Sequence, residues 1–231
     1  MVQVLHERSR IMRYGWSILV CLVLAMSLMT RSTEAASYKM EQQLIPILGV
    51  TTGQGPTGTV AYLILTFEER EDSTGLSVQF KNAPGRFSRM AQTAVEQAIY
   101  RTARATGLSP DSWTVVLAVP YPHVTIYGES LSAMIGLTVL ALARHEFIPP
   151  DRVITGTVTA DGHIGSVGAL QLKIEAASEA HLRRVLVPDE LDISDGDWET
   201  PFLLQVSPVG SISQAYEALT DHPLLPQLSS R

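Results

Sequence analysis

Residues 128–136 read GESLSAMIG, residues 153–162 read VITGTVTADG, and residues 168–177 read GALQLKIEAA. The first stretch opens an apolar helix, the second is typical of a strand that runs into an Asp-Gly turn, and the third opens another helix. Ser132 stands at the start of the first helix, and Lys173 lies inside the last one. A serine and a lysine placed in this way indicate a Ser–Lys hydrolase.

Lys173 falls on the apolar face of its expected helix. Spacings of three and four residues give it a common face with Leu170, Ile174 and Ala177. The opposite face carries the polar residues Gln171, Glu175 and Glu179. Burial disfavours the charged form of an amine, so a lysine on the apolar face can take a proton from a serine hydroxyl. The alternative is a snorkelling lysine, which has an apolar stem and a solvated ammonium.

Ser132 occupies the other kind of position, a helix start. Helix starts leave N–H groups unpaired and carry the positive end of the dipole, which suits a nascent oxyanion. The alternative for Ser132 is an ordinary N-cap. Ser130 is the alternative candidate for the nucleophile. His123 is a candidate for a third member of the site or for a residue at its rim. Glu129 either approaches the site or caps a turn.

These segments resemble the proteolytic domain of Lon proteases, peptidase family S16, which uses a Ser–Lys dyad. Residues 129–134, ESLSAM, match the family motif D-G-P-S-A-G, and residues 154–159, ITGTVT, match M-T-G-E-I-T. Residues 168–177 match G-G-L-K-E-K-x-x-A-A, and residues 184–188, RVLVP, correspond to K-x-V-L-I-P. The similarity extends from about residue 49 to about residue 219.

The resemblance implies a role for each residue of the site. Ser132 takes the place of the nucleophile and Lys173 that of the catalytic base. Thr155 would orient the lysine by a hydrogen bond, and backbone N–H groups around Ser132 and Ala133 would hold the oxyanion. Glu129 takes the place of the motif aspartate. The implied fold is α+β, the layered fold of Lon proteolytic domains (ribosomal protein S5 domain 2-like), and the ring assembly of the family implies a homo-oligomer.

The chain departs from the family pattern next to the serine. Glu129 replaces Asp, Leu131 replaces Pro, and Met134 replaces the Gly that follows Ser-Ala. The Met134 side chain is expected to crowd the turn that presents the serine, or to narrow the cleft. No G-x-x-x-x-G-K-[ST] motif of an ATPase module occurs in the sequence, so activity is expected to run without ATP unless a separate partner unfolds the substrate.

The N-terminus predicts export. Residues 1–13 are basic, and Trp16 to Thr30 form an uncharged apolar run of 15 residues, shorter than the roughly 20 of a membrane-spanning helix. We therefore interpret residues 1–36 as a signal peptide or an uncleaved N-terminal membrane anchor. Either one places the body outside the cytoplasm, in the periplasm or at the outer face of the inner membrane. Residues 37–44 are expected to be a linker, residues 45–222 the proteolytic-type domain, and residues 223–231 a loose tail.

Composition and spacing exclude several functions. Without the four Arg and two Glu of residues 1–36, the chain carries 13 basic and 21 acidic side chains, a net charge of −8, which disfavours nucleic-acid binding. The one cysteine, Cys21, precedes the body, and the His residues lack ligand-like spacing, so no metal site and no cofactor is expected. Residues 53–58, GQGPTG, fit G-x-G-x-x-G but lead into a β-branched stretch, which favours a hairpin turn.

Hydrophobic periodicity predicts the remaining elements. Strands are expected at residues 45–50, 59–67, 76–80, 113–119, 153–160, 185–188 and 202–206, and helices at residues 88–106, 132–144, 168–182 and 212–220. Strands and helices are mixed without strict βαβ alternation, which indicates an α+β domain.

Two hypotheses about function remain. The first is an exported, ATP-independent, Lon-like serine endopeptidase that cleaves peptides or unfolded protein segments. The second is a peptide-binding or scaffold module with weak or no turnover, which the departures at Leu131 and Met134 would explain.

Overall fold

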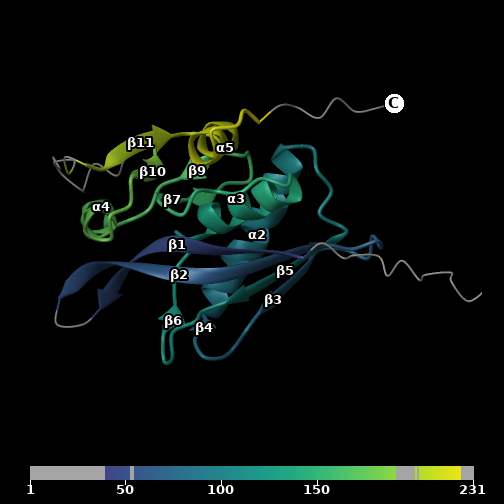
Figure 1. Ribbon diagram of the computed structural model, residues 1–231, viewed down its shortest axis with the longest axis horizontal. Coiled ribbons are helices and arrows are strands. Elements are labelled where there is room, and N and C mark those ends of the chain that lie inside the picture. Colours follow the sequence, from purple (N-terminus) through teal and green to yellow (C-terminus); the bar gives the residue numbers. More distant parts are fainter. Residues whose placement is uncertain (1–39, 53–54, 191–200, 202, 225–231) are drawn as a thin grey trace, which may run out of the picture. The chain divides into compact units, whose positions relative to one another are not determined.

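The computed structural model describes residues 40–52, 55–190, 201 and 203–224, and all of them belong to one unit, Tyr38–Arg231. Helices and several small sheets are mixed along the chain, which is compatible with an α+β fold (Figure 1). The described helices are α2 (Arg89–Ala105), α3 (Ser132–Ala143), α4 (Leu170–Glu179) and α5 (Ile212–Thr220).

The larger sheet has the strand order β1-β2-β5-β3. Its strands are β1 (Glu41–Thr52), β2 (Pro56–Glu69), β5 (Trp113–Ala118) and β3 (Ser77–Phe80). β1 and β2 form a long antiparallel hairpin that runs from the pair Glu41 and Phe67 to the pair Thr52 and Pro56. β5 pairs with β2 only from Ile64 onward, so the first half of β2 extends beyond the end of β5.

A second sheet has the order β11-β10-β7, with parallel strands throughout. It consists of β7 (Arg152–Ile154), β10 (Arg184–Pro188) and β11 (Gln205–Val209). Two short pairs complete the described strands, β4 (Arg86–Phe87) with β6 (Thr125–Ile126), and β8 (Thr157–Val158) with β9 (Ile164–Gly165).

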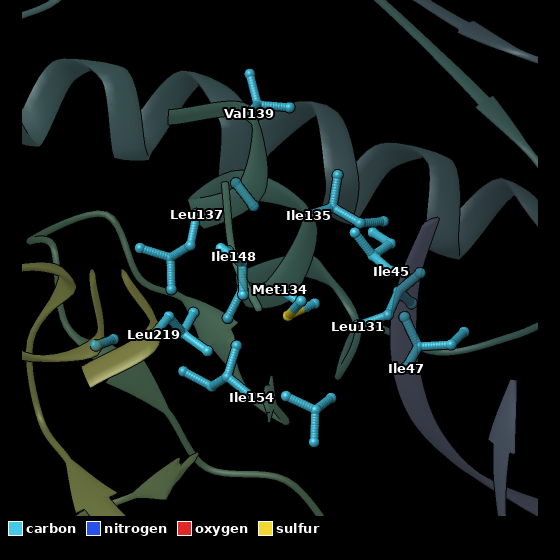
Figure 2. Packing of buried hydrophobic residues seen from close by; sticks show 14 of the residues in the cluster. Ile45, Ile47, Leu131, Met134, Ile135, Leu137, Val139, Ile148, Ile154 and Leu219 are labelled. Atoms are coloured by element: carbon cyan, nitrogen blue, oxygen red, sulfur yellow. The ribbon is translucent and has the colours of Figure 1, made fainter. Parts of the chain in front are cut away.

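Helix α3 lies at the centre of the core. Every residue from Ser132 to Leu142 is buried, as its nearly continuous apolar sequence predicts. The helix contacts α2, α5 and strands of both sheets. Figure 2 shows side chains of α3, among them Met134, Ile135 and Leu137, together with Ile45 of β1, Ile154 of β7 and Leu219 of α5. The start of α3 is therefore fixed from several directions.

Several expectations from the sequence are confirmed. Helix α5 has the expected bounds, and α2 lies within one residue of the expected range 88–106 at each end. Ser88 precedes α2, and its hydroxyl accepts a hydrogen bond from the N–H of Ala91 at 3.2 Å. Gly107 follows α2 with φ +73°, as a C′ glycine does. Residues 56–58, the described end of the glycine-rich stretch, begin strand β2, so this stretch does not lead into a helix. Asp161 and Gly162 connect β8 and β9 of a hairpin.

Other boundaries differ from the expectations. β1 begins at Glu41, inside the segment expected to be a linker, because the long β2 pairs with it along its whole length. Helix α4 is shorter than residues 168–182, and β11 occupies residues 205–209 instead of 202–206. The expected strand 153–160 is two strands, β7 and β8, interrupted at Thr155 and Gly156.

The N-terminal segment 1–36 and residues 225–231 lie outside the described residues. Within the described ranges, no helix combines the length and the apolar character that crossing a membrane requires.

Candidate functional site

The two residues between β7 and β8, Thr155 and Gly156, form hydrogen bonds both to the second sheet and to the turn before α3. The N–H of Thr155 donates to the carbonyl of Leu186 at 3.1 Å, which continues the pairing with β10. The N–H of Gly156 instead donates to the carbonyl of Ser130 at 2.9 Å, and the Gly156 carbonyl accepts from the N–H of Ala133 at 3.1 Å. The turn that leads into α3 is therefore hydrogen bonded to Gly156 on both sides of Ser132.

The same short segment receives the lysine from α4. Lys173 Nζ donates a hydrogen bond to Thr155 Oγ1 at 3.2 Å. Both side chains are buried, with exposed fractions of 5% for Lys173 and 1% for Thr155. The buried residues of α4 are those of the expected apolar face, so the ammonium points inward and the snorkelling alternative does not hold.

Ser132 is the first residue of α3 and is 2% exposed. The cap position belongs to Leu131, and no side chain caps this helix start. The N-cap interpretation of Ser132 is therefore wrong. Ala133 and Ser130 bond to Gly156, and Lys173 bonds to Thr155, so the structure joins the turn around Ser132 and the Lys173 side chain to two adjacent residues.

The N–H groups expected to hold an oxyanion are engaged within the chain. The N–H of Ser132 donates to the carbonyl of Glu129 at 2.9 Å, and that of Ala133 donates to Gly156. The expectation of an open oxyanion hole at these two residues is not met in this structure. The acceptor for Ser132 lies in the same turn, whereas the acceptor for Ala133 comes from the distant break between β7 and β8.

A cavity of about 1020 Å³ lies beside the lysine. Its walls come from β1, from the first half of β2, from the segment 121–131, and from the start of α4. Aliphatic and aromatic residues dominate the lining, among them Ile47, Val50, Val60, Tyr62, Tyr127 and Leu131. Of the lining residues in the described ranges, only Lys173 carries a charge. The cavity thus offers an apolar channel with one amine in its wall.

The remaining candidates are distributed unevenly around this cavity. Ser130 lines it and is half-buried, whereas Ser132 is not among the lining residues. His123 and Glu129 are exposed and do not line it; Glu129 contributes its carbonyl to the turn. Met134 is fully buried in the core and does not line the cavity, so it narrows no part of it.

Two features of the site were not expected from the sequence. Ala169, which precedes α4 and lines the cavity, has the left-handed conformation with φ +56°. Tyr121, also in the wall, accepts a hydrogen bond from the N–H of Tyr62 at 3.2 Å through its hydroxyl, just beyond the end of β5. The loop YPHVTIY at 121–127 is unusually apolar for a connection, and that was the available signal.

No group of three or more His, Cys, Asp or Glu residues in the described part of the chain could hold a metal ion.

Comparison with known proteins gives a consistent set of relatives. The chain is 30% identical over 138 residues to an archaeal Lon protease of Archaeoglobus fulgidus, a match that covers 58% of this chain and 22% of the relative. It is 27% identical over 154 residues to a Lon protease of Aquifex aeolicus, covering 65% and 19%. It is 26% identical over 191 residues to an archaeal Lon protease of Thermoplasma volcanium, covering 81% and 28%.

The chain therefore spans less than a third of the length of each of these relatives. No protein-family model matches the chain. Together these matches support a Lon protease-like domain in this chain.

Proposed function

We propose that this Lon protease-like domain is a serine endopeptidase in which Ser132 is the nucleophile, Lys173 is the general base and Thr155 positions Lys173. The hydrogen bond from Lys173 Nζ to Thr155 Oγ1 carries the proposal. Burying a lysine in an apolar core costs free energy, so a buried lysine is expected to have a function. Lys173 bonds to Thr155, and the next residue, Gly156, holds the turn around Ser132 through two backbone hydrogen bonds.

The proposed reaction is acyl transfer in two steps. Ser132 Oγ bonds to the scissile carbonyl carbon while its proton passes to the neutral Lys173 amine. Lys173 then gives that proton to the leaving nitrogen as the C–N bond breaks, which leaves an ester on Ser132. Water attacks the ester, Lys173 accepts the water proton, and that proton returns to the serine oxygen.

The reaction needs a local rearrangement at Gly156. The developing oxyanion requires N–H donors at about 2.7–3.1 Å, but the N–H groups of Ser132 and Ala133 already have acceptors. Rotation of the Gly156 carbonyl away from Ala133 would release one donor.

The cavity supports a substrate class. Its volume suits several residues of a peptide, and its apolar lining favours segments with aliphatic or aromatic side chains. Such segments are accessible in peptides and unfolded proteins. We extend the proposal to action without ATP, to a homo-oligomer with the ribosomal protein S5 domain 2-like fold, and to export directed by residues 1–36.

The test uses the 231-residue chain and a fluorophosphonate probe, which phosphonylates nucleophilic serines with loss of fluoride. Wild type, Ser132→Ala, Lys173→Ala and Ser130→Ala are treated from about pH 6 to about pH 10, so that a lysine with a pKa below the usual value of about 10.4 is detected. Intact mass reports the adduct. Ser130→Ala is the matched control, since Ser130 lies two residues away and lines the cavity.

We expect one adduct on wild type and on Ser130→Ala, none on Ser132→Ala, and labelling about 100-fold slower or more for Lys173→Ala. If Ser130→Ala instead loses the adduct while Ser132→Ala keeps it, the nucleophile is Ser130. If folded wild type gains no adduct at any pH, the peptidase proposal fails.

A second function rests on the buried Ser132 and the engaged N–H groups. In that case the domain binds peptides in the apolar cavity with weak or no turnover. A fluorescent apolar peptide would then bind wild type and Ser132→Ala equally and remain uncleaved.

A further inference from the structure

Gly58 lies where β2 passes beneath α4. A Cβ atom at Gly58 would stand 1.9 Å from the carbonyl oxygen of Leu172, 2.6 Å from the carbonyl carbon of Leu172, and 3.0 Å from the Cβ of Ala176. A separation of 1.9 Å is far inside the van der Waals contact of carbon and oxygen. Only glycine therefore allows the helix backbone to approach β2 this closely.

This contact reaches the lysine through one peptide bond. Leu172 precedes Lys173 in α4, and the N–H of Lys173 donates to the carbonyl of Ala169 at 3.3 Å as part of the helix. A helix is a stiff element, so pushing the Leu172 carbonyl away from β2 also moves the base of the Lys173 side chain.

The acceptor of the lysine would not follow such a movement. Thr155 is held by the carbonyl of Leu186 in the other sheet. The Lys173 to Thr155 bond is already 3.2 Å long, at the long end of the range for N–H···O bonds. A displacement of the helix by a fraction of an ångström is enough to weaken it.

We infer that Gly58 is a positioning residue, whose missing side chain seats α4 on β2 so that Lys173 meets Thr155. The inference deepens the proposed function and rests on it for the catalytic meaning of that contact. The geometric statement can be tested separately from catalysis.

The chain offers a matched control on the neighbouring strand. Gly49 of β1 is paired with Thr59, next to Gly58 in the register. A Cβ at Gly49 would meet only Thr59 Cγ2, at 3.6 Å, which is ordinary contact. Gly49 lines the cavity, so Gly49→Ala is the control for Lys173 acetylation: it makes the same chemical change in the same hairpin without touching α4.

The experiment compares the 231-residue wild type with Gly49→Ala and Gly58→Ala. Each is exposed to acetic anhydride across a pH series, and the acetylation of Lys173 is followed by peptide mass. We expect slow acetylation in wild type and Gly49→Ala. In Gly58→Ala we expect an increase of about fivefold or more, since local opening controls access to buried groups. Labelling of Ser132 by the fluorophosphonate is expected to fall about 10- to 100-fold in Gly58→Ala.

Equal acetylation of Lys173 in folded Gly58→Ala and Gly49→Ala, with the same pH profile, would overturn the inference. If Gly58→Ala does not fold, Ala176→Val presses on the same contact from the helix side and is measured in the same way. Wild type that never labels at Ser132 defeats the proposed peptidase, while the acetylation comparison still decides the position of Lys173.

Discussion

Lys173 Nζ and Thr155 Oγ1 form a buried hydrogen bond 3.2 Å long between α4 and the break that separates β7 from β8. Thr155 and Gly156 are the two residues between those strands. Gly156 holds the turn around Ser132 through two backbone hydrogen bonds. The break in the strand is thus what links the lysine to the serine. Substitutions of Thr155 and of Lys173 therefore test this link separately.

Thr155→Val removes the hydroxyl and keeps the shape of the side chain. Because one partner of the buried lysine is lost, we expect the free energy of unfolding to fall by about 1–3 kcal/mol. Labelling of Ser132 should slow by about tenfold or more, since the base is no longer oriented. Urea unfolding and probe kinetics measure the two effects. Thr155→Ser keeps the hydroxyl and should label at close to the wild-type rate; equal rates in all three proteins would rule out a positioning role for Thr155.

Lys173→Met distinguishes the effect of the buried lysine on the free energy of unfolding from its proposed role as the base. Methionine has a similar length and no charge, so it should leave the free energy of unfolding unchanged or raise it by about 1 kcal/mol. The same substitution removes the proposed base and should slow Ser132 labelling by about 100-fold. Chemical unfolding and labelling on one preparation give both numbers. A variant that is markedly less stable, or one that labels normally, contradicts this account of Lys173.

The sequence predicted the elements that local pattern controls. The apolar run of α3 could only be a central helix, and the apolar face of α4 identified Lys173 as buried. The break at Thr155 could not be predicted, because residues 153–160 are rich in β-branched side chains and are typical of one strand. At the break, the Gly156 N–H donates to Ser130 and its carbonyl accepts from Ala133, and these partners lie more than twenty residues away in the chain.

The oxyanion donors could not be predicted for the same reason. A helix start suggests unpaired N–H groups, but the turn from Glu129 closes onto Ser132 and Gly156 accepts from Ala133. The close packing of α4 on Gly58 likewise depends on a contact between β2 and α4, which are distant in the sequence.

Ala169→Gly should stabilise the protein. Ala169 has φ +56°, and a left-handed conformation costs an alanine roughly 1–2 kcal/mol. Glycine adopts it freely but loses more chain entropy on folding, about 0.5–1 kcal/mol, so the expected net gain is about 0.5–1 kcal/mol by urea unfolding. Ala180→Gly, at the other end of α4 where φ is −79°, should instead destabilise. Stabilisation by both substitutions, or by neither, would contradict strain at Ala169.

The carboxylate of Asp221 should make the protein less stable in acid than at neutral pH. It follows α5 and receives hydrogen bonds from Arg152 and Arg184, and those from Arg152 above all hold the pKa of its carboxyl below the usual value of 3.8. Because the folded pKa is the lower one, this carboxylate stabilises the protein above pH 3.8, and its contribution is lost as the pH falls through the folded pKa. Asp221→Asn keeps a residue that tolerates the left-handed conformation found there, φ +61°. The melting temperature of the variant should therefore lie below that of wild type at neutral pH, and the two should converge in strong acid. The difference should be small, since Asp221 is 59% exposed and solvent screens its ion pairs. A constant difference at every pH would show that the carboxylate charge is not what Arg152 and Arg184 recognise.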